Sequence, residues 1–249
     1  MTRLRSLSAS ELLDVWEQSV NAHSVERALC FLSACCGEAK EELAALSIGQ
    51  RDTRLLEIYR QLFGPAMDCF AQCPACGERL EYSLSADELM QPAIEQKQVF
   101  TLEAEEIFLR LRLIDSGDLQ AIRSCADSEN ARMMLLERCV LEASQSGHAI
   151  KVQSLPESVV EEIASRLAKA DPQAEVWIDL ACCACRHAWQ VIFDIELLLW
   201  AKVNALAKRL LQEVHLLAHA YGWGERDILA LSARRRQAYL EMAGSWQTF

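Results

Sequence analysis

The most informative segment of the chain is residues 73–84, which read Cys-Pro-Ala-Cys-Gly-Glu-Arg-Leu-Glu-Tyr-Ser-Leu. Two cysteines three positions apart in a tight turn can direct both thiolates at one zinc ion. Pro74 makes this turn rigid, and Gly77 can adopt a positive φ at little cost. The alternation of polar and apolar residues over 79–84 is typical of a strand. The segment therefore predicts a zinc knuckle followed by a strand.

A second cysteine cluster, residues 182–187, reads Cys-Cys-Ala-Cys-Arg-His. It contains one CxxC pair, Cys182 and Cys185, and an alternating segment follows it, as one follows the first knuckle. Two knuckle-and-strand units that face each other form a zinc ribbon, with the four cysteines as ligands. We therefore expect Cys73, Cys76, Cys182 and Cys185 to bind one structural Zn²⁺.

The second knuckle departs from the first in three residues. Arg186 stands where glycine is expected and would strain the turn, Cys183 is an additional thiol, and His187 could replace a sulfur ligand if the register shifts. The knuckles are also separated by far more than the about 15–20 residues of a compact ribbon, so the segment between them must leave the sheet and return. A metal-free ribbon and a thiol redox centre therefore remain open as alternatives. The redox interpretation lacks a pair that opens a helix after a strand.

Composition limits the classes of function. The chain of 249 residues is 51% hydrophobic, which is enough for a large core, and its net charge of −11 works against binding to a phosphate backbone. A basic protein surface is a better partner. The first residues lack the apolar core of a secretory signal, and charges interrupt the apolar segment 195–217, so we expect a cytoplasmic protein without a membrane span. Catalytic motifs such as GxSxG or HExxH are absent from the sequence, which predicts a protein that is not an enzyme.

Helical periodicity covers most of the remaining sequence. We expect an α+β fold that is predominantly helical, with a small zinc-ribbon-like antiparallel sheet. Its three regions form one integrated fold: an N-terminal helical region (1–72), the ribbon-like region (73–193) with a helical insertion at about 115–172, and a C-terminal helical arm (194–249). We expect a helix that is capped by Ser24 and ends at Gly37. The other expected helices are 9–20, 53–63, 128–144, 156–170, 194–220, 225–231 and 233–242. The expected strands are 79–84, 98–102, 107–113, 175–180 and 188–193.

Near the C-terminus, the chain reads Glu213-Val-His-Leu-Leu-Ala-His-Ala-Tyr-Gly-Trp-Gly-Glu-Arg-Asp-Ile-Leu-Ala-Leu-Ser-Ala-Arg-Arg-Arg-Gln-Ala-Tyr-Leu-Glu241. This segment, the two knuckles with their strands, and residues 193–201 resemble the baseplate-hub assembly proteins of T-even-type phages and related contractile injection systems. The resemblance implies an assembly chaperone or a minor structural protein, stabilised by zinc, with baseplate or tail proteins as partners. It also implies that the protein is cytoplasmic or incorporated in a phage-like particle.

The same segment contains the candidate partner contacts. These are the aromatic residues of the Tyr-Gly-Trp turn and the only basic run of the chain: Tyr221, Trp223, Arg234, Arg235 and Arg236. The alternative is that the aromatic side chains pack within a helical hairpin and that the arginines form a solvated face. For the whole protein, the alternative function is a zinc-ribbon module that binds nucleic acid or associates with transcription, and a thiol oxidoreductase is the third.

Overall fold

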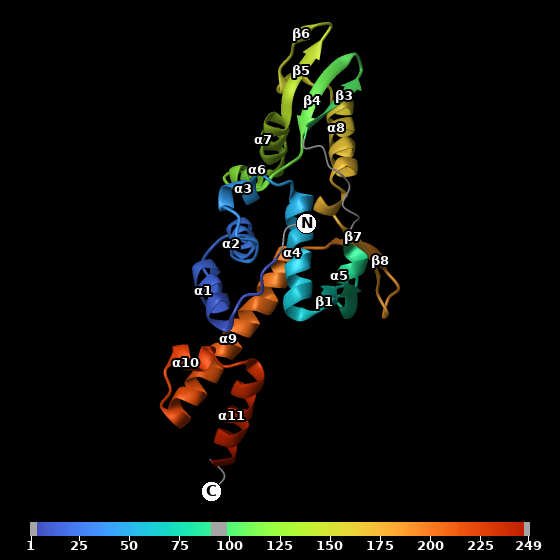
Figure 1. Cartoon of the computed structure of the whole chain (residues 1–249). Coiled ribbons are helices and arrows are strands. Elements are labelled where there is room, and N and C mark those ends of the chain that lie inside the picture. The colour runs from blue at the N-terminus through green and yellow to red at the C-terminus, as the bar shows by residue number, and fades with distance from the viewer. Residues whose placement is uncertain (1–3, 91–98, 247–249) are drawn as a thin grey trace. The chain divides into compact units, whose positions relative to one another are not determined.

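The computed structural model describes residues 4–90 and 99–246 and divides the chain into two compact units. Unit 1 combines residues 1–38 with 196–249, and unit 2 is the continuous segment 39–195. Both units are rich in helix, and the strands form small antiparallel sheets (Figure 1), which confirms the predicted α+β, predominantly helical class. The units group the chain differently from the three regions expected from the sequence, because the two terminal segments belong to one unit.

Unit 1 consists of helices. The predicted start of the first helix is confirmed: the Ser8 side chain accepts from the Glu11 N–H, and Glu11 accepts from the Ser8 N–H. The second helix is capped by His23 and not by the predicted Ser24, and it ends, as predicted, at Gly37 with a φ of 73°. The helices of this unit are α1 (Ala9–Ser19), α2 (Ser24–Cys36), α9 (Ile195–Tyr221, from its second residue onward), α10 (Glu225–Leu229) and α11 (Ala233–Trp246).

Polar and aromatic contacts join α9 to the two N-terminal helices of unit 1. The indole N–H of Trp16 donates to Asn204 at 2.9 Å, and Arg27 forms an ion pair with Glu196 at 2.8 Å. The Arg27 guanidinium also lies over the ring of Trp200. These contacts accompany the burial of apolar residues from all three helices, so segments from the two ends of the chain form one core.

Unit 2 combines helices with three small sheets. Its helices and strands are α3 (Lys40–Ala44), α4 (Ile48–Phe63), β1 (Ala66–Gln72), β2 (Arg79–Ser85), α5 (Ala86–Leu89), β3 (Val99–Ala104), β4 (Ile107–Arg112), α6 (Ser116–Ile122), α7 (Ser128–Cys139), β5 (Val140–Gln145), β6 (His148–Ala149), η1 (Val152–Ser154), α8 (Glu157–Ala170), η2 (Pro172–Ala174), β7 (Trp177–Ala181) and β8 (Ala188–Ile192). The described residues of β3–β6 form one antiparallel sheet, whereas β1–β2 and β7–β8 form separate hairpins.

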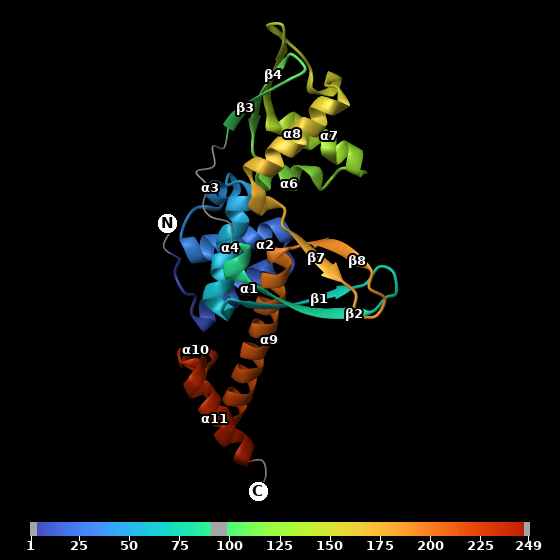
Figure 2. The same cartoon turned by 90° about the vertical axis from the view of Figure 1, so that its right-hand side faces the viewer.

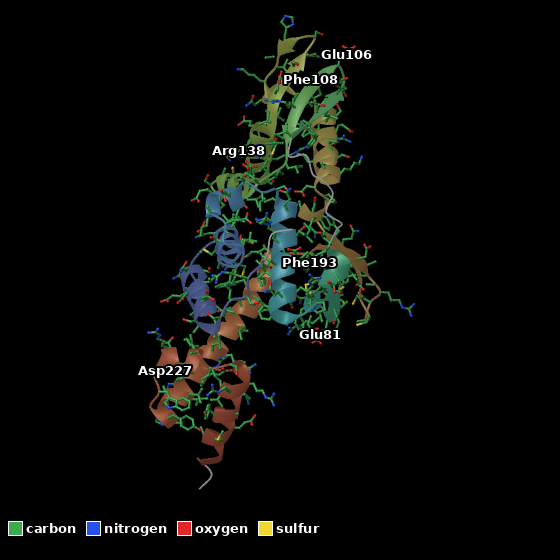
Figure 3. All side chains as sticks on the ribbon, in the orientation of Figure 1. Glu81, Glu106, Phe108, Arg138, Phe193 and Asp227 are labelled. Carbon is green, nitrogen blue, oxygen red and sulfur yellow. The ribbon has the colours of Figure 1, made fainter. Side chains whose placement is uncertain are left out.

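The four-stranded sheet lies between the two cysteine clusters in sequence. Its apolar face is covered by α7 and α8, which lie on the same side of the sheet in Figure 2. Leu109 of β4 is fully buried in this core and pairs in register with Leu102 of β3 and Ala143 of β5. The strands predicted at 98–102 and 107–113 correspond to β3 and β4, which pair as a hairpin; its turn contains Glu105 and Glu106, both with positive φ, and Figure 3 labels Glu106 there.

Three predictions about unit 2 are wrong in detail. Residues 140–144, predicted as the end of a helix, form β5, because pairing with β4 outweighs the helical periodicity. The helix predicted from 53 begins at Ile48, where Ser47 and Gln50 form a capping box. The helical insertion expected at about 115–172 also contains two strands, β5 and β6, which join the predicted strands β3 and β4 in one sheet. The elements α3, β1 and α5 were not predicted, and residue 98, at the start of a predicted strand, lies outside the described residues.

Candidate metal centre

Each cysteine knuckle closes one of the two β-hairpins of unit 2. The pairing of β1 with β2 ends at Gln72 and Arg79, and residues 73–78 connect the strands. The pairing of β7 with β8 ends at Ala181 and Ala188, and residues 182–187 make the equivalent connection. Figure 2 shows the two hairpins side by side, with their turns at the same end. The sequence prediction of two facing knuckle-and-strand units is therefore confirmed, although β1 was not foreseen.

The two knuckles have the same backbone hydrogen bonds. In the first, the Cys73 N–H donates to the Glu78 carbonyl at 2.8 Å, and the Gly77 N–H donates to the Cys73 carbonyl at 2.9 Å. In the second, the Cys182 N–H donates to the His187 carbonyl at 2.9 Å, and the Arg186 N–H donates to the Cys182 carbonyl at 2.9 Å. The second knuckle thus adopts the full turn in spite of its irregular sequence.

Arg186 adopts the backbone conformation that glycine has in the first knuckle. Its φ is 61°, and the φ of Gly77 is 77°. A side chain in this left-handed region brings Cβ close to the following carbonyl oxygen, which costs roughly 1–2 kcal/mol. The strain expected from the sequence at Arg186 is therefore present, and the rest of the turn holds the residue there.

The four predicted ligands are brought together. The Sγ atoms of Cys73 and Cys185 are 3.6 Å apart, as are those of Cys76 and Cys182, and all four lie within 4.8 Å of one another. Four thiolates around a tetrahedral zinc ion, with Zn–S bonds of about 2.3 Å, have sulfur–sulfur distances of roughly 3.8 Å. The observed cluster therefore fits a tetrahedral thiophilic cation.

The charges of the thiols also favour a cation. The backbone N–H of Cys185, helped by that of Ala184, lowers the pKa of Cys182 to about 7 against the effect of burial. The Glu78 N–H lowers the pKa of Cys76, but the neighbouring thiols and desolvation raise it to about 12 overall. Hydrogen bonds thus favour the thiolate of Cys182, whereas hydrogen bonds with the neighbouring thiols favour the protonated form of Cys76. A divalent ion bound to the four sulfurs would favour their deprotonated forms.

Two residues that could have replaced a ligand lie outside the cluster. Cys183 is exposed, and the group of metal-binding side chains among the described residues contains only the four predicted cysteines at this place. The exposed ring of His187 stacks on Trp189, with centroids 6.0 Å apart. Within the four-thiol cluster, Cys73 and Cys182 are buried, and Cys76 and Cys185 are exposed.

The two knuckles also lie within a segment that matches a known family. Residues 11–200 match the family model of the T4 bacteriophage base plate protein. The chain belongs to this family. The matched range includes both knuckles and residues 193–200, but it ends before the segment 213–241, whose pattern first resembled phage assembly proteins. Comparisons with curated proteins and with solved structures give no match.

The candidate partner residues of unit 1 include an aromatic cluster. The rings of Tyr221 and Trp223 stack with centroids 4.7 Å apart, and Tyr239 of α11 packs edge-on against Trp223 at 4.8 Å. The Tyr221 hydroxyl donates to the Tyr239 carbonyl at 3.0 Å. Both candidate aromatic residues therefore make contacts within the helical hairpin of α9 and α11.

The three arginines of the basic run differ in their surroundings. Arg234 and Arg235 are exposed, whereas Arg236 is only 5% exposed. Arg236 donates to Glu213 at 2.8 Å and to the Leu231 carbonyl at 2.6 Å. The guanidinium of Arg236 is thus engaged within unit 1, and the two preceding arginines are the exposed members of the run.

Asp171 of unit 2 is a buried polar residue that was missed in the sequence. It lies between α8 and η2, is 5% exposed, and accepts a hydrogen bond from the Gly49 N–H at 2.9 Å. Its second oxygen has no hydrogen-bond partner among the described residues. The only local sign was an aspartate followed by Pro172 at a helix end, which does not distinguish it from ordinary capping residues.

Asp118, in the first turn of α6, completes a capping box with Asp115 and also forms a buried ionic network. It is fully buried and receives two hydrogen bonds of 2.7 Å from Arg112 and another from Arg138. Burial raises its pKa, but the hydrogen bonds from Arg112, from the Asp115 N–H and from Arg138 outweigh it and lower the pKa overall. This network ties the end of β4 to α6 and α7.

Proposed function

We propose that the chain is a non-catalytic assembly factor or minor structural protein of a phage-like contractile tail baseplate. The observation that carries the proposal is the family match over residues 11–200. A base plate is built from proteins, so the match supports protein partners from the same tail. No described helix is long and apolar enough to cross a membrane.

We also propose that Cys73, Cys76, Cys182 and Cys185 hold a structural zinc ion. The supporting observations are the four Sγ atoms within 4.8 Å of one another and the matching turns that present them. Bound zinc would join two segments of unit 2 that are 106 positions apart at Cys76 and Cys182. Because the metal binds the folded chain and not the unfolded one, its binding energy would stabilise unit 2.

Arg234 and Arg235 are the proposed partner contacts in unit 1. Their side chains are exposed on α11, and Tyr221 and Trp223 would act indirectly by fixing α11 against α9. The double change Arg234→Glu and Arg235→Glu should weaken association with the partner and leave thermal stability unchanged. Unchanged association would contradict their role as contacts.

Co-expression tests the proposed function. The tagged full chain is produced with the tail and baseplate proteins encoded beside its gene, and complexes are analysed by size-exclusion chromatography with light scattering. We expect a complex of defined stoichiometry containing about one zinc ion per copy of this chain. The nucleic-acid alternative predicts salt-sensitive binding of DNA or RNA by the purified chain. Such binding, without any complex with tail proteins, would contradict the proposal.

A further inference from the structure

An apolar groove of about 590 Å³ lies in unit 2, on the surface formed by α7 and α8. Leu135 of α7 and Leu167 of α8 line it, together with the small side chains of Ala131 and Ala168. Ile192, at the end of β8, also lines the groove and is 55% exposed. Ile192 pairs in register with Trp177, which is 49% exposed, so the apolar surface continues onto the second knuckle hairpin.

Asp171 lines the same groove and has unused hydrogen-bonding capacity. One of its oxygens accepts from the Gly49 N–H at 2.9 Å. The other, Oδ1, is buried and lacks a hydrogen-bond partner among the residues that the structure describes. A buried oxygen atom without a partner costs about 1–3 kcal/mol, and more when it is charged. A donor that reached Oδ1 from the groove would remove this cost.

The surroundings of Asp171 favour a positively charged donor. Burial raises the pKa of Asp52 against the opposing effect of Arg51, and the carboxylates of Asp194 and Asp171 raise it further. Asp171 is therefore close to other carboxylates. Unit 2 also carries the whole net charge of −11, because unit 1 contains equal numbers of acidic and basic residues. An approaching cation is attracted by the unit, and the groove itself is lined by two carboxylates, Asp171 and Glu175, and by one cation, Arg132, which pairs with Glu157.

The backbone holds Asp171 in this position. A Cβ atom on Gly49 would lie 2.0 Å from Asp171 Oδ1, so only glycine allows the carboxylate to approach the first turn of α4. The residues concerned are 122 positions apart and come from different elements. A carboxylate placed so closely, with one oxygen bonded and one unused, has the features of a prepared binding position.

We propose that this groove binds an apolar segment of a partner protein and that a lysine or arginine of that segment pairs with Asp171. The inference rests on the proposed role in a tail baseplate and adds to it the site and the chemistry of the partner. The apolar side chains of the segment would cover Leu135, Leu167 and Ile192. Its cation would complete the hydrogen bonding of Asp171 Oδ1 and set the register of the bound segment.

Two variants and one control test the groove in the full chain. Asp171→Asn removes the charge but keeps an oxygen for the Gly49 N–H. Ala168→Phe fills the groove from an exposed position on α8, where the fold tolerates a larger side chain. Ala149→Phe adds the same ring at an exposed position of β6 that does not line the groove. Circular dichroism and zinc content show that each variant is folded.

The first measurement is association with the co-expressed baseplate and tail proteins. Both groove variants should lose the complex that the wild-type chain and Ala149→Phe form. A wild-type chain that associates with none of these proteins contradicts the proposed function and this inference together. Association that persists in both groove variants contradicts the inference alone.

The second measurement identifies the segment. Overlapping 15-residue peptides from the co-purified protein are tested for binding by fluorescence polarisation. The binding peptide should combine apolar residues with a lysine or arginine, and its Kd should weaken about tenfold or more with either groove variant. A peptide in which glutamine replaces that basic residue should bind the wild-type chain about as weakly as the original peptide binds Asp171→Asn. The same replacement should have little further effect on binding to Asp171→Asn. A binding peptide without a basic residue, or a dimer of this chain that Ala168→Phe abolishes, would overturn the proposal.

Discussion

The Sγ atoms of Cys76 and Cys182 lie 3.6 Å apart, although 106 positions separate the two residues in sequence. The segment between them has its own core, formed by β4 and β5 with α7 and α8. The two hairpins on either side of it each have only two strands, and a two-stranded hairpin is marginally stable by itself in water. A metal ion shared by the knuckles would therefore join two structures that are individually weak.

Replacing one ligand should remove the zinc and destabilise unit 2. For Cys73→Ser we expect zinc content to fall from about one ion per chain to near zero, and unfolding free energy to fall by about 3 kcal/mol or more, because the binding energy of structural zinc contributes to folding. Zinc is measured by mass spectrometry and stability by thermal unfolding. Cys183→Ser is the matched control, since Cys183 is exposed and outside the cluster. Equal stability of the two variants would show that the cluster has no structural role.

The knuckle turns should respond oppositely to two substitutions. Gly77→Ala places a side chain at a φ of 77° and should lower the free energy of unfolding by about 1 kcal/mol. Arg186→Gly relieves the strain at a φ of 61°, although the unfolded chain gains conformational freedom. We expect stability to stay the same or to rise by less than about 1 kcal/mol. Urea unfolding of the zinc-loaded chain measures both. A loss of stability on Arg186→Gly, equal to that of Gly77→Ala, would contradict this account.

The four ligands could be predicted because their evidence is local. A CxxC pair followed by an alternating strand indicates a knuckle without knowledge of the rest of the fold, and Ser8 with Glu11 indicates a helix start in the same way. The error at β5 has a different origin. Residues 140–144 continue the helical periodicity of the preceding segment, but they form a strand because Leu109 and Ala143 meet in register. That contact joins distant parts of the sequence.

The groove and Asp171 could not have been predicted for the same reason. The position of Asp171 is defined by Gly49, 122 positions away, and its neighbours come from several elements. Ala131 and Ala168 look like ordinary helix-forming residues in sequence, and they line a groove only because α7 and α8 come together. The sequence around each of these residues carries no information about such an arrangement.

The buried carboxylate of Asp118 should make the stability of unit 2 sensitive to acid. Asp118→Asn removes the charge that pairs with Arg112 and Arg138, and we expect a loss of about 2 kcal/mol at neutral pH, because both arginines remain partly exposed. The folded-state pKa is lowered, so this contribution is complete above the unfolded pKa of about 3.9 and disappears as pH falls through the folded pKa.

Urea unfolding at neutral and acidic pH measures this effect. The difference between the wild-type chain and Asp118→Asn should shrink as the pH approaches the folded-state pKa. Asp87→Asn is the control, since Asp87 pairs with Arg60 where both side chains are about half exposed. Its change should be below about 1 kcal/mol. A difference for Asp118→Asn that grows in acid would have the wrong sign for a carboxylate with a lowered pKa.

The neighbouring arginines of α11 should separate stability from binding in unit 1. Arg236→Ala removes one partner of Glu213, which is 9% exposed; among the described residues, the ion pair that Glu213 keeps is with the largely exposed Arg209. We expect a loss of about 2–3 kcal/mol, because a buried charge remains with weaker pairing. Arg235→Ala changes an exposed side chain and should alter stability by less than about 0.5 kcal/mol. Urea unfolding compares them. Equal stability of the two variants would show that the buried pair of Arg236 and Glu213 does not hold α11 against α9. The contacts among the rings of Tyr221, Trp223 and Tyr239 would then have to hold this hairpin together.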